Sequence, residues 1–443
     1  MPGPTPVPVQ GDETLPESVD VVVIGGGIIG ASTAFELSQA GLKVALCEKG
    51  GIGHEQSSRN WGWVRISRRD PREVPLMADS LNLWRDLDRR LGRNTGYRRT
   101  GAIFLAHDEA AEEAHAKWRR HLEPHQIESA LVRGKDLTDL FDGRDLGAKA
   151  ALVTPTDGYA EPQAVAPAYA EAARDAGASI LTNCAVRGFE TEAGAISAVV
   201  TERGSIACTQ AVLAGGAWSN LFCGNAGIDL PQLRVVNNVL RTEPVAGGPE
   251  QPVKHKNFAL RKRQDGGYTL AAGTASRVDL VPDCLRYARR FWPAYKAERA
   301  NLSFRFGRPF FAELGRRRRW RLDEVTPFEK ERVLDPAPSP AAQLAALRSV
   351  AALFPAFAGA KVAQHWSGCI DVTPDAIPVI SAVEEVPGFF IATGFSGHGF
   401  GIGPGAGRLM AEIVRGVPTT VDHAAFRYSR FTDGSRPEPQ DGI

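Results

Sequence analysis

The chain has 443 residues, which is enough for about two or three domains that each bury a substantial core. Lys and Arg together number 52 and Asp and Glu 51, so the net charge of +1 predicts no overall attraction to nucleic acid or to an anionic membrane. Hydrophobic residues make up 43% and charged residues 23% of the chain, which excludes a largely disordered protein and a disulfide miniprotein.

The N-terminus and the cysteines indicate where the protein resides. Residues 1–18 are rich in Pro and lack the features of a secretory signal, so we expect them to form a loose arm. No uninterrupted apolar run reaches about 18 residues, so we expect no membrane-spanning helix. The six cysteines are scattered without a CxxC pair or a histidine cluster, which favours reduced thiols in a cytoplasmic protein over a metal site.

The first structured segment predicts a strand followed by a phosphate-binding turn. Residues 19–24 form a short, β-branched apolar run, typical of a strand buried on both faces of a parallel sheet. Gly25, Gly27 and Gly30 follow with the GxGxxG spacing. One glycine makes the tight turn, the next lets backbone N–H groups reach a pyrophosphate, and the third lets the helix pack closely on the strand.

The residues after this turn complete a dinucleotide-binding βαβ unit. Residues 31–40 have helix-forming content, Gly41 is a helix stop, and residues 43–47 predict a second strand. Glu48 stands at the end of that strand, where a carboxylate can accept hydrogen bonds from an adenosine ribose. The sequence therefore predicts dinucleotide binding.

The segment after Glu48 resembles the Ser-rich loop of a flavoprotein family that contains D-amino-acid dehydrogenase, glycine oxidase and monomeric sarcosine oxidase. That loop is residues 57–65, SSRNWGWVR. Further blocks resemble the same family in the same order, so the resemblance spans about residues 19 to 425. They are residues 157–162 with a helix over 164–176, a strand at Val186, a second Gly-rich turn over 211–219, and a strand with a glycine cluster over 389–401.

The resemblance implies an α/β protein with a Rossmann-like FAD-binding domain of the glutathione-reductase type. It also implies a second, α+β substrate domain built on an antiparallel sheet, with strands such as residues 235–242 and 268–272. We expect the FAD-binding domain to comprise residues 19–90, 150–225 and 365–423, the substrate domain residues 91–149 and 226–364, and the C-terminal tail residues 424–443, which we expect to be mobile from Thr432 onward.

The implied cofactor is FAD, because the glycine cluster before a helical stretch at residues 405–414 offers a second set of N–H donors that NAD would not require. Noncovalent binding is expected, because Cys369 falls one position from the flavin-linking cysteine of some relatives and His54 is read as a solvated loop histidine. The cofactor-binding residues implied are Gly25, Gly27, Ile29, Gly30, Glu48, Lys49, Ser57, Ser58, Asn60, Gly62, Val186, Gly215, Gly216, Trp218, Gly394, Ser396, Gly397, His398, Gly399 and Phe400.

The implied activity is oxidation of an amine or amino acid to an imine, by hydride transfer to the flavin followed by hydrolysis. Arg65 resembles the family's arginine beside the isoalloxazine, where its charge would favour the reduced flavin. His398 lies between two glycines, where its imidazole could contact the ring or the substrate, or simply order the loop. Arg65, His398 and Asp371 are the candidate catalytic residues.

The residues at 370 and 371 raise a question about the charge of the substrate. Amino-acid-oxidising relatives often have Arg-Pro here, with the arginine clamping the substrate carboxylate, whereas this chain has Ile370 and Asp371. If Asp371 faces the pocket, it favours a cationic amine, and substrates with a second cationic group are expected to react best. If Asp371 is instead a structural residue, Arg65 or Arg261 is expected to clamp a carboxylate.

The electron acceptor is left open between dioxygen, a quinone and a protein. Sarcosine-oxidase-like relatives activate dioxygen with a lysine on a strand that aligns with residues 268–270, and Thr269 stands at that position here. This difference favours a dehydrogenase.

A basic stretch over residues 286–321 holds twelve Lys and Arg residues interleaved with aromatic residues. We expect the aromatic side chains to belong to the core and the arginines to a solvated surface. The alternative is binding of nucleic acid, since one branch of the flavin family oxidises an amine on a modified tRNA.

Overall fold

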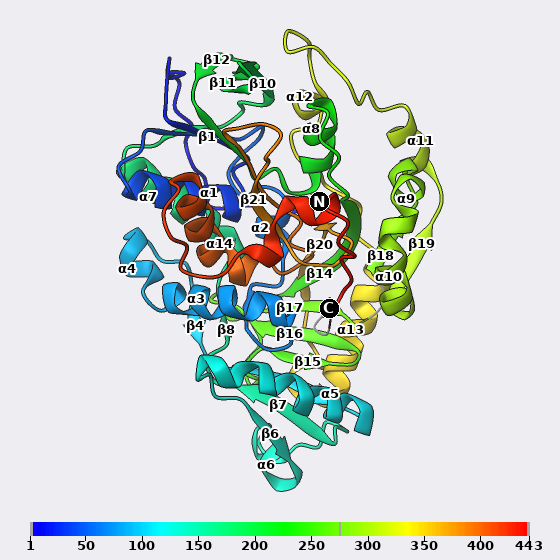
Figure 1. Ribbon diagram of the computed structural model, residues 1–443. Helices are drawn as coiled ribbons and strands as arrows, with labels where there is room; N and C mark the ends of the chain where they lie inside the picture. Colours follow the sequence, from blue (N-terminus) through cyan, green and yellow to red (C-terminus); the bar gives the residue numbers. More distant parts are fainter. Residues whose placement is uncertain (1–2, 274–275, 441–443) are drawn as a thin grey trace.

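The computed structural model describes residues 3–273 and 276–440 and confirms the expected α/β architecture. Two large sheets organise the chain, and Figure 1 shows the smaller one around β1 and β21 above the larger one, which runs from β14 down to β6. Among the described residues, no helix is both long and apolar enough to cross a lipid bilayer.

The first sheet has six strands, and β1 pairs in parallel with β2 on one side and β13 on the other. An antiparallel edge strand, β21, closes it beyond β22. In spatial order the strands are β21 (Val379–Ala382), β22 (Phe389–Thr393), β13 (Gln210–Leu213), β1 (Val21–Ile24), β2 (Val44–Cys47) and β9 (Ser179–Leu181).

Both faces of β1 are covered, which is why this strand is apolar at every position. Val21 and Val23 pack in the core beneath the helices α1 (Ile28–Gln39), α3 (Val74–Arg85), α7 (Pro162–Asp175) and α14 (Gly399–Val414). Val22 and Ile24 pack on the opposite face, against a three-stranded antiparallel sheet of β10 (Val186–Glu192), β11 (Ala195–Thr201) and β12 (Gly204–Ala207).

The second sheet has ten strands and is largely antiparallel. Its longest pair joins β14 to β20, from Leu233 opposite Val372 to Thr242 opposite Val362. The strands are β19 (Leu302–Arg305), β18 (Ser276–Asp279), β14 (Leu233–Thr242) with β20 (Val362–Val372), β17 (Tyr268–Ala272), β16 (Phe258–Lys262), β15 (Val253–His255), β5 (Ala102–Ala106), β7 (Ala150–Thr154) and β6 (Ala130–Arg133).

The sheet membership of β7 and β20 differs from the expected domain boundaries. Residues 150–225 and 365–423 were expected in the FAD-binding domain, but β7 and β20 pair within the ten-stranded sheet. The next strand after β20 is β21, at the edge of the six-stranded sheet, so one segment connects the two sheets.

Short elements and helices cover the sheets and form the connections. They are α2 (Gln56–Arg59), β3 (Trp63–Val64), η1 (Pro71–Glu73), α4 (Leu87–Leu91), β4 (Arg98–Arg99), α5 (Glu109–Arg119), η2 (Arg120–His125), α6 (Gly134–Asp139), β8 (Gly158–Tyr159), η3 (Gly216–Trp218), α8 (Ser219–Asn225), α9 (Pro282–Arg286), α10 (Ala288–Glu298), η4 (Arg299–Asn301), α11 (Arg308–Leu314), α12 (Pro327–Lys330), α13 (Pro340–Leu353), η5 (Pro355–Phe357), η6 (Ala424–Phe426) and η7 (Tyr428–Phe431).

The described N-terminal segment and the first part of the C-terminal tail lie against the fold. For the N-terminal segment this differs from the loose arm expected from the sequence. In the N-terminal segment, the Val7 N–H donates to the Gln163 carbonyl at 2.9 Å, and Ser18 forms a bridge with Ala207. Near the C-terminus, Phe426 is buried and the Arg430 guanidinium pairs with Asp375 at 3.0 Å.

The aromatic residues of the basic stretch are mostly on the surface, so the expectation that they belong to the core is wrong. Trp292, Phe304, Phe306 and Phe311 are exposed, and none of the residues in α10 or α11 is buried. Tyr287 and Trp320 are buried exceptions, and Trp320 packs beside Phe328. Figure 1 shows α9, α10, α11 and β19 along one side of the molecule.

The turn between β1 and α1 generates the first prediction. A Cβ atom at Gly30 would overlap the carbonyl oxygen of Gly25, so Gly30→Ala is expected to lower the free energy of unfolding by roughly 3 kcal/mol. Thermal unfolding measures the effect. The control is Gly224→Ala in α8, where an added Cβ meets nothing within 4 Å. Equal melting temperatures for the two variants would contradict the close approach.

Candidate active site

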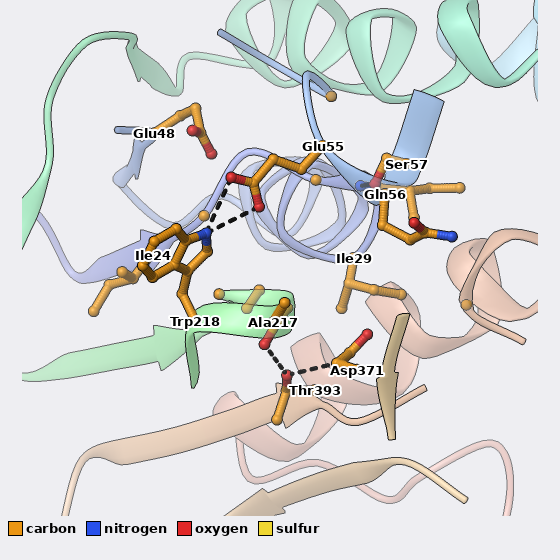
Figure 2. Close-up of a pocket in the computed structure, with 18 of the residues that line it drawn as sticks. Ile24, Ile29, Glu48, Glu55, Gln56, Ser57, Ala217, Trp218, Asp371 and Thr393 are labelled. Carbon is orange, nitrogen blue, oxygen red and sulfur yellow. Dashed lines mark hydrogen bonds between the residues drawn. The ribbon is translucent and has the colours of Figure 1, made fainter. Parts of the chain in front are cut away.

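A cleft opens where the C-terminal ends of β1, β2 and β13 meet the N-terminal ends of α1 and α14. We call it the glycine-rich cleft, and Figure 2 shows part of its lining. Fourteen of the residues expected to bind the cofactor line it: Gly25, Gly27, Ile29, Glu48, Lys49, Ser57, Asn60, Val186, Gly215, Gly216, Trp218, Gly397, Gly399 and Phe400.

Four residues expected at the cofactor act behind this surface instead. A Cβ atom at Gly30 or Gly62 would overlap or crowd a backbone carbonyl, so both glycines are needed for close packing. The Ser58 hydroxyl donates to the Glu55 carbonyl at 3.2 Å, and the Gly394 N–H donates to Asp371 at 2.7 Å. The remaining two, Ser396 and His398, line a different cavity, described below.

The cleft has the donors that a dinucleotide needs. Neither α1 nor α14 has a side-chain cap on its N-cap residue, and both helix N-termini face the cleft. Uncapped helix N-termini bind anions through their free N–H groups and the helix dipole. At α1, the Ser57 hydroxyl accepts a hydrogen bond from Ile28 N–H at 2.9 Å, which fixes the Ser-rich loop against the turn.

Acidic residues hold the walls of the cleft. The Glu48 carboxylate accepts hydrogen bonds from the N–H groups of Gly26 and Gly50, both at 2.7 Å. Glu55 was not among the residues expected from the sequence. Its carboxylate accepts a hydrogen bond from the Trp218 indole at 3.0 Å and forms an ion pair with Lys49 at 2.6 Å. Figure 2 shows the Glu55–Trp218 contact across the cleft. The neighbouring Ser-rich loop was the only sequence signal for Glu55.

Asp371 belongs to the cleft and not to a substrate pocket. Its carboxylate accepts hydrogen bonds from the Gly394 N–H at 2.7 Å and from the Thr393 hydroxyl and Gln232 amide at 3.3 Å. Figure 2 shows Asp371 beside Thr393. Its neighbour Ile370 lines the larger cavity. This placement favours a structural role for Asp371 over contact with a cationic amine, because its carboxylate holds the loop after β22.

A cavity of about 770 Å³ lies between the two sheets and borders the glycine-rich cleft. The two share Gln56, Asn60, Gly397 and Phe400 as lining residues, so a ligand in the cavity can reach a ligand in the cleft. Its walls come from β14, β15, β17, β18 and β20, from the loop around β3, and from α9 and α10. A cavity this size between domains is typical of a small-molecule site.

The cavity is strongly cationic. Among the described residues, its lining includes six Lys and Arg side chains, Arg59, Arg65, Arg69, Arg234, Lys254 and Lys256, and one carboxylate, Glu298. Three of the arginines are paired elsewhere: Arg59 with Asp335 at 2.5 Å, Arg69 with Glu73 at 3.9 Å, and Arg234 with Glu313 at 3.1 Å.

Arg65 and Lys254 form no ion pair with any carboxylate in the described part of the chain. Burial lowers the pKa of the Arg65 guanidinium to about 9, and the nearby Arg69 lowers it further. Burial, together with the charge of Arg65, lowers the pKa of Lys254 to about 8. Lys254 lies over the Trp61 ring at 5.4 Å. Two desolvated cations side by side are costly unless a ligand supplies negative charge.

The loop that carries Arg65 is anchored on buried groups. Asp157 accepts hydrogen bonds from the Ile66 N–H at 2.7 Å and from the Ser67 hydroxyl at 2.5 Å. Burial raises the pKa of the Asp157 carboxyl to about 6. The Trp118 indole donates to the Arg69 carbonyl at 2.7 Å, so residues from two separate segments of the chain fix the loop.

His398 lines the cavity but not the glycine-rich cleft. Its Nδ1 lies 2.8 Å from the Glu73 carboxylate, a contact that no sequence pattern indicated. Both side chains are buried. Burial lowers the pKa of the imidazole, while the charge of Glu73 acts in the opposite direction.

Two other expectations about the cavity differ from the structure. Arg261, the alternative carboxylate clamp, is fully buried and pairs with Glu161 at 2.8 Å, outside the cavity lining. Thr269 is also buried and its hydroxyl accepts a hydrogen bond from Arg261. Lys254, two strands away in the sheet, is a half-buried lysine that lines the cavity. Its short strand, β15, gave no recognisable motif.

Comparisons with known proteins agree with this geometry. A family model described as FAD dependent oxidoreductase matches residues 20–413. The chain is 26% identical to the sarcosine oxidase subunit beta of Rhodobacter capsulatus, over 94% of this chain and 89% of that protein. It is 25% identical to the glycine oxidase of Pseudomonas aeruginosa, over 92% and 97%.

Solved structures extend the likeness to the whole fold. The structure of L-amino acid deaminase from Proteus myxofaciens, in complex with anthranilate, superimposes with a TM-score of 0.93 and 32% sequence identity, over 96% of this chain and 97% of that chain. L-Proline dehydrogenase from P. horikoshii superimposes with a TM-score of 0.77 and 25% identity. The chain therefore belongs to the FAD dependent oxidoreductase family, whose relatives act on amines and amino acids.

Proposed function

We propose that this protein binds FAD noncovalently in the glycine-rich cleft and oxidises an amino acid held by its carboxylate in the cationic cavity. The observation that carries the proposal is the pair of half-buried cations in the cavity wall, Arg65 and Lys254, which form no ion pair with a carboxylate in the described part of the chain. The printed names of the relatives, glycine oxidase and L-amino acid deaminase among them, support an amino acid as the substrate.

The cleft fits FAD on its donor chemistry. The uncapped N-terminus of α1 suits the pyrophosphate, and Glu48 lies where an adenosine ribose is expected. The N-terminus of α14 suits the electron-rich edge of the isoalloxazine. When bound, FAD supplies an acceptor for two electrons and a proton as hydride.

Arg65 and Lys254 are placed to bind the carboxylate and to orient the substrate. Two charge-assisted contacts to one carboxylate fix its position, and so the position of the adjacent Cα–H. The rest of the lining is rich in aromatic residues, including Trp61, Trp63 and Phe291, which suits an apolar side chain. The proposed substrate class is therefore an α-amino acid or N-alkyl amino acid, in place of the dicationic amine expected from the sequence.

The basic stretch does not enter this proposal. Many of its arginines are paired within the fold: Arg286 and Arg290 with Asp229, at 2.9 and 3.1 Å, and Arg318 with Asp283 at 2.7 Å. Nothing in the comparisons supports a nucleic-acid substrate, so we do not propose the tRNA alternative.

The electron acceptor needs a separate measurement. The argument for a dehydrogenase depended on the lack of a lysine at residue 269, but Lys254 presents an amine to the cavity from another strand. Anaerobic reduction of the flavin by substrate, followed by admission of air, decides between the two. Return of the yellow colour within one turnover indicates an oxidase, and persistence of the bleached state indicates a dehydrogenase.

The second prediction concerns the cofactor. The purified protein is expected to be yellow, and acid precipitation is expected to release FAD into the supernatant, where chromatography distinguishes it from FMN. Flavin that stays with the precipitated chain would contradict noncovalent binding. Cys369 and His54 line the cleft, so Cys369→Ala and His54→Ala would then locate the bond.

The third prediction concerns the carboxylate clamp. Arg65→Met and Lys254→Met are each expected to raise KM for an amino acid about tenfold or more, because each removes a charge-assisted contact worth roughly 1.5–3 kcal/mol. Flavin bleaching under anaerobic conditions measures the reaction. The control is Lys361→Met, which removes an exposed charge outside the cavity lining and is expected to leave KM unchanged.

The same assay compares each amino acid with its decarboxylated amine. The wild type is expected to prefer the amino acid, and both clamp variants are expected to lose much of that preference. A wild-type preference for plain or dicationic amines would contradict the clamp.

The fourth prediction concerns Asp371 as the anchor of the loop after β22. Asp371→Ala leaves the Gly394 N–H without its acceptor, a loss of roughly 1–3 kcal/mol, and is expected to weaken FAD binding and lower the melting temperature. Asp265→Ala is the control, because Asp265 accepts a bond from Gly267 N–H in a hairpin away from the cleft. If Asp371→Ala keeps its FAD affinity but changes KM for cationic substrates, Asp371 binds the substrate and does not anchor the loop.

A further inference from the structure

His398 and Glu73 form a buried carboxylate–imidazole pair at the boundary between the cleft and the cavity. The pair joins two segments far apart in the chain, the N-cap residue of α14 and the last residue of the turn before α3. The Glu73 side chain is fully buried, and its other oxygen, Oε1, has no hydrogen-bond partner. A buried carboxylate with one free oxygen is costly, which makes a purely structural role a poor explanation.

The rest of His398 is fixed, so that one ring nitrogen remains for a ligand. Its backbone N–H donates to the Phe395 carbonyl at 2.7 Å, and its carbonyl accepts a bond from Arg69 at 3.2 Å. Its Nδ1 is occupied by Glu73. No described residue hydrogen-bonds Nε2, and the residue lines the cavity that we assign to the substrate.

Oxidation of an amino acid requires an acceptor for a proton. The substrate arrives as an ammonium ion, and hydride can leave Cα only when the nitrogen has a free electron pair to form the C=N bond. The proton on nitrogen must therefore be transferred to another group before or during hydride transfer. A fixed side-chain base at the cavity wall can accept this proton directly from the substrate nitrogen.

We propose that His398 is the catalytic base that accepts this proton at Nε2, and that Glu73 is the positioning residue that orients its ring. The substrate N–H bond breaks, its electron pair stays on nitrogen, and the proton passes to Nε2. FAD, when bound, would supply the acceptor for the Cα–H electron pair as hydride, and the freed nitrogen pair would form the C=N bond. This assignment rests on the proposed function only in requiring an amine substrate, and does not depend on the clamp.

The charges around the imidazole suit this role. Glu73 faces it from the turn before α3, and Arg69 and Arg65 face it from the loop after β3. Burial and the two arginines keep the free imidazole neutral near pH 7, because they lower its pKa. Glu73 opposes them and stabilises the imidazolium once the proton has arrived.

The fifth prediction is a change in pH profile. At saturating substrate, the rate of anaerobic flavin bleaching in the wild type is expected to rise with pH as His398 loses its proton and then to level off. His398→Asn is expected to slow bleaching by about 10²-fold or more near neutral pH, with the rate recovering only near the pKa of the substrate's own amine. The control is His125→Asn on the surface, which is expected to keep the wild-type profile.

Glu73 is tested by a readout that does not depend on turnover. In ¹⁵N-histidine-labelled holoenzyme without substrate, the ring resonance lost in His398→Asn reports the titration of this imidazole. Glu73→Gln is expected to shift that titration to lower pH, because it removes the charge that favours the imidazolium, and Glu73→Asp is expected to restore part of the shift. Glu123→Gln, which changes an exposed carboxylate, is expected to leave the titration unchanged.

Several results would overturn the assignment. The first is a bleaching rate in His398→Asn that still rises with pH as in the wild type. The second is loss of this pH dependence in Lys254→Met instead. The third is an imidazole titration that Glu73→Gln does not move to lower pH. Because any amine that bleaches the flavin can be used, a preference for plain amines would refute the clamp and leave this test intact. Failure of the pH test with an amino-acid substrate would refute the base and leave the proposed function intact.

Discussion

The close approach of α1 to the turn after β1 is the constraint on which the rest of the structure depends. Gly30 lies against the carbonyl of Gly25, so the helix begins almost on top of the strand end. This contact directs the uncapped N-terminus of α1 into the cleft. On its other side α1 packs with α14 and α7 over the central strands. A displaced α1 would therefore disturb both the phosphate site and the core.

The site is assembled where the two sheets meet, and β20 makes the connection. It runs the length of β14 in the ten-stranded sheet and then continues toward β21 of the six-stranded sheet. Near its end, Ile370 faces the cavity while Asp371 holds the loop after β22. Adjacent residues of a strand point to opposite sides, so one strand serves both compartments.

The arrangement of charge in the cavity is costly to folding and useful to function. Arg65 and Lys254 are both desolvated, and the charge of Arg65 lowers the pKa of Lys254. Glu73 is buried with one oxygen unpaired. Ionisable groups that lack a partner in the fold are typical of functional sites, where a ligand supplies the missing charge or hydrogen bond. The exposed aromatic residues of α10 and α11 lie at the outer side, and Trp292 and Tyr295 also line the cavity.

The sequence by itself determined the cofactor half of the protein. The βαβ unit, its glycine spacing, the Ser-rich loop and the final glycine cluster are local patterns, because each is set by contacts between a strand, its turn and the next helix. Most residues expected at the cofactor therefore do line the cleft. Local sequence patterns could not assign the role of Asp371. A carboxylate at this position has the same sequence context whether it binds a ligand or a backbone N–H.

Only the tertiary structure decided the substrate half. Lys254 meets Arg65, and Glu73 meets His398, across separations of about 190 and 325 residues, and no periodicity or motif reports such pairings. The aromatic residues of the basic stretch have the composition of a core, but none of the residues of α10 and α11 is buried in the described structure. Local pattern fixes how a segment folds, whereas the partner of a buried charge is fixed by which segments the sheets bring together.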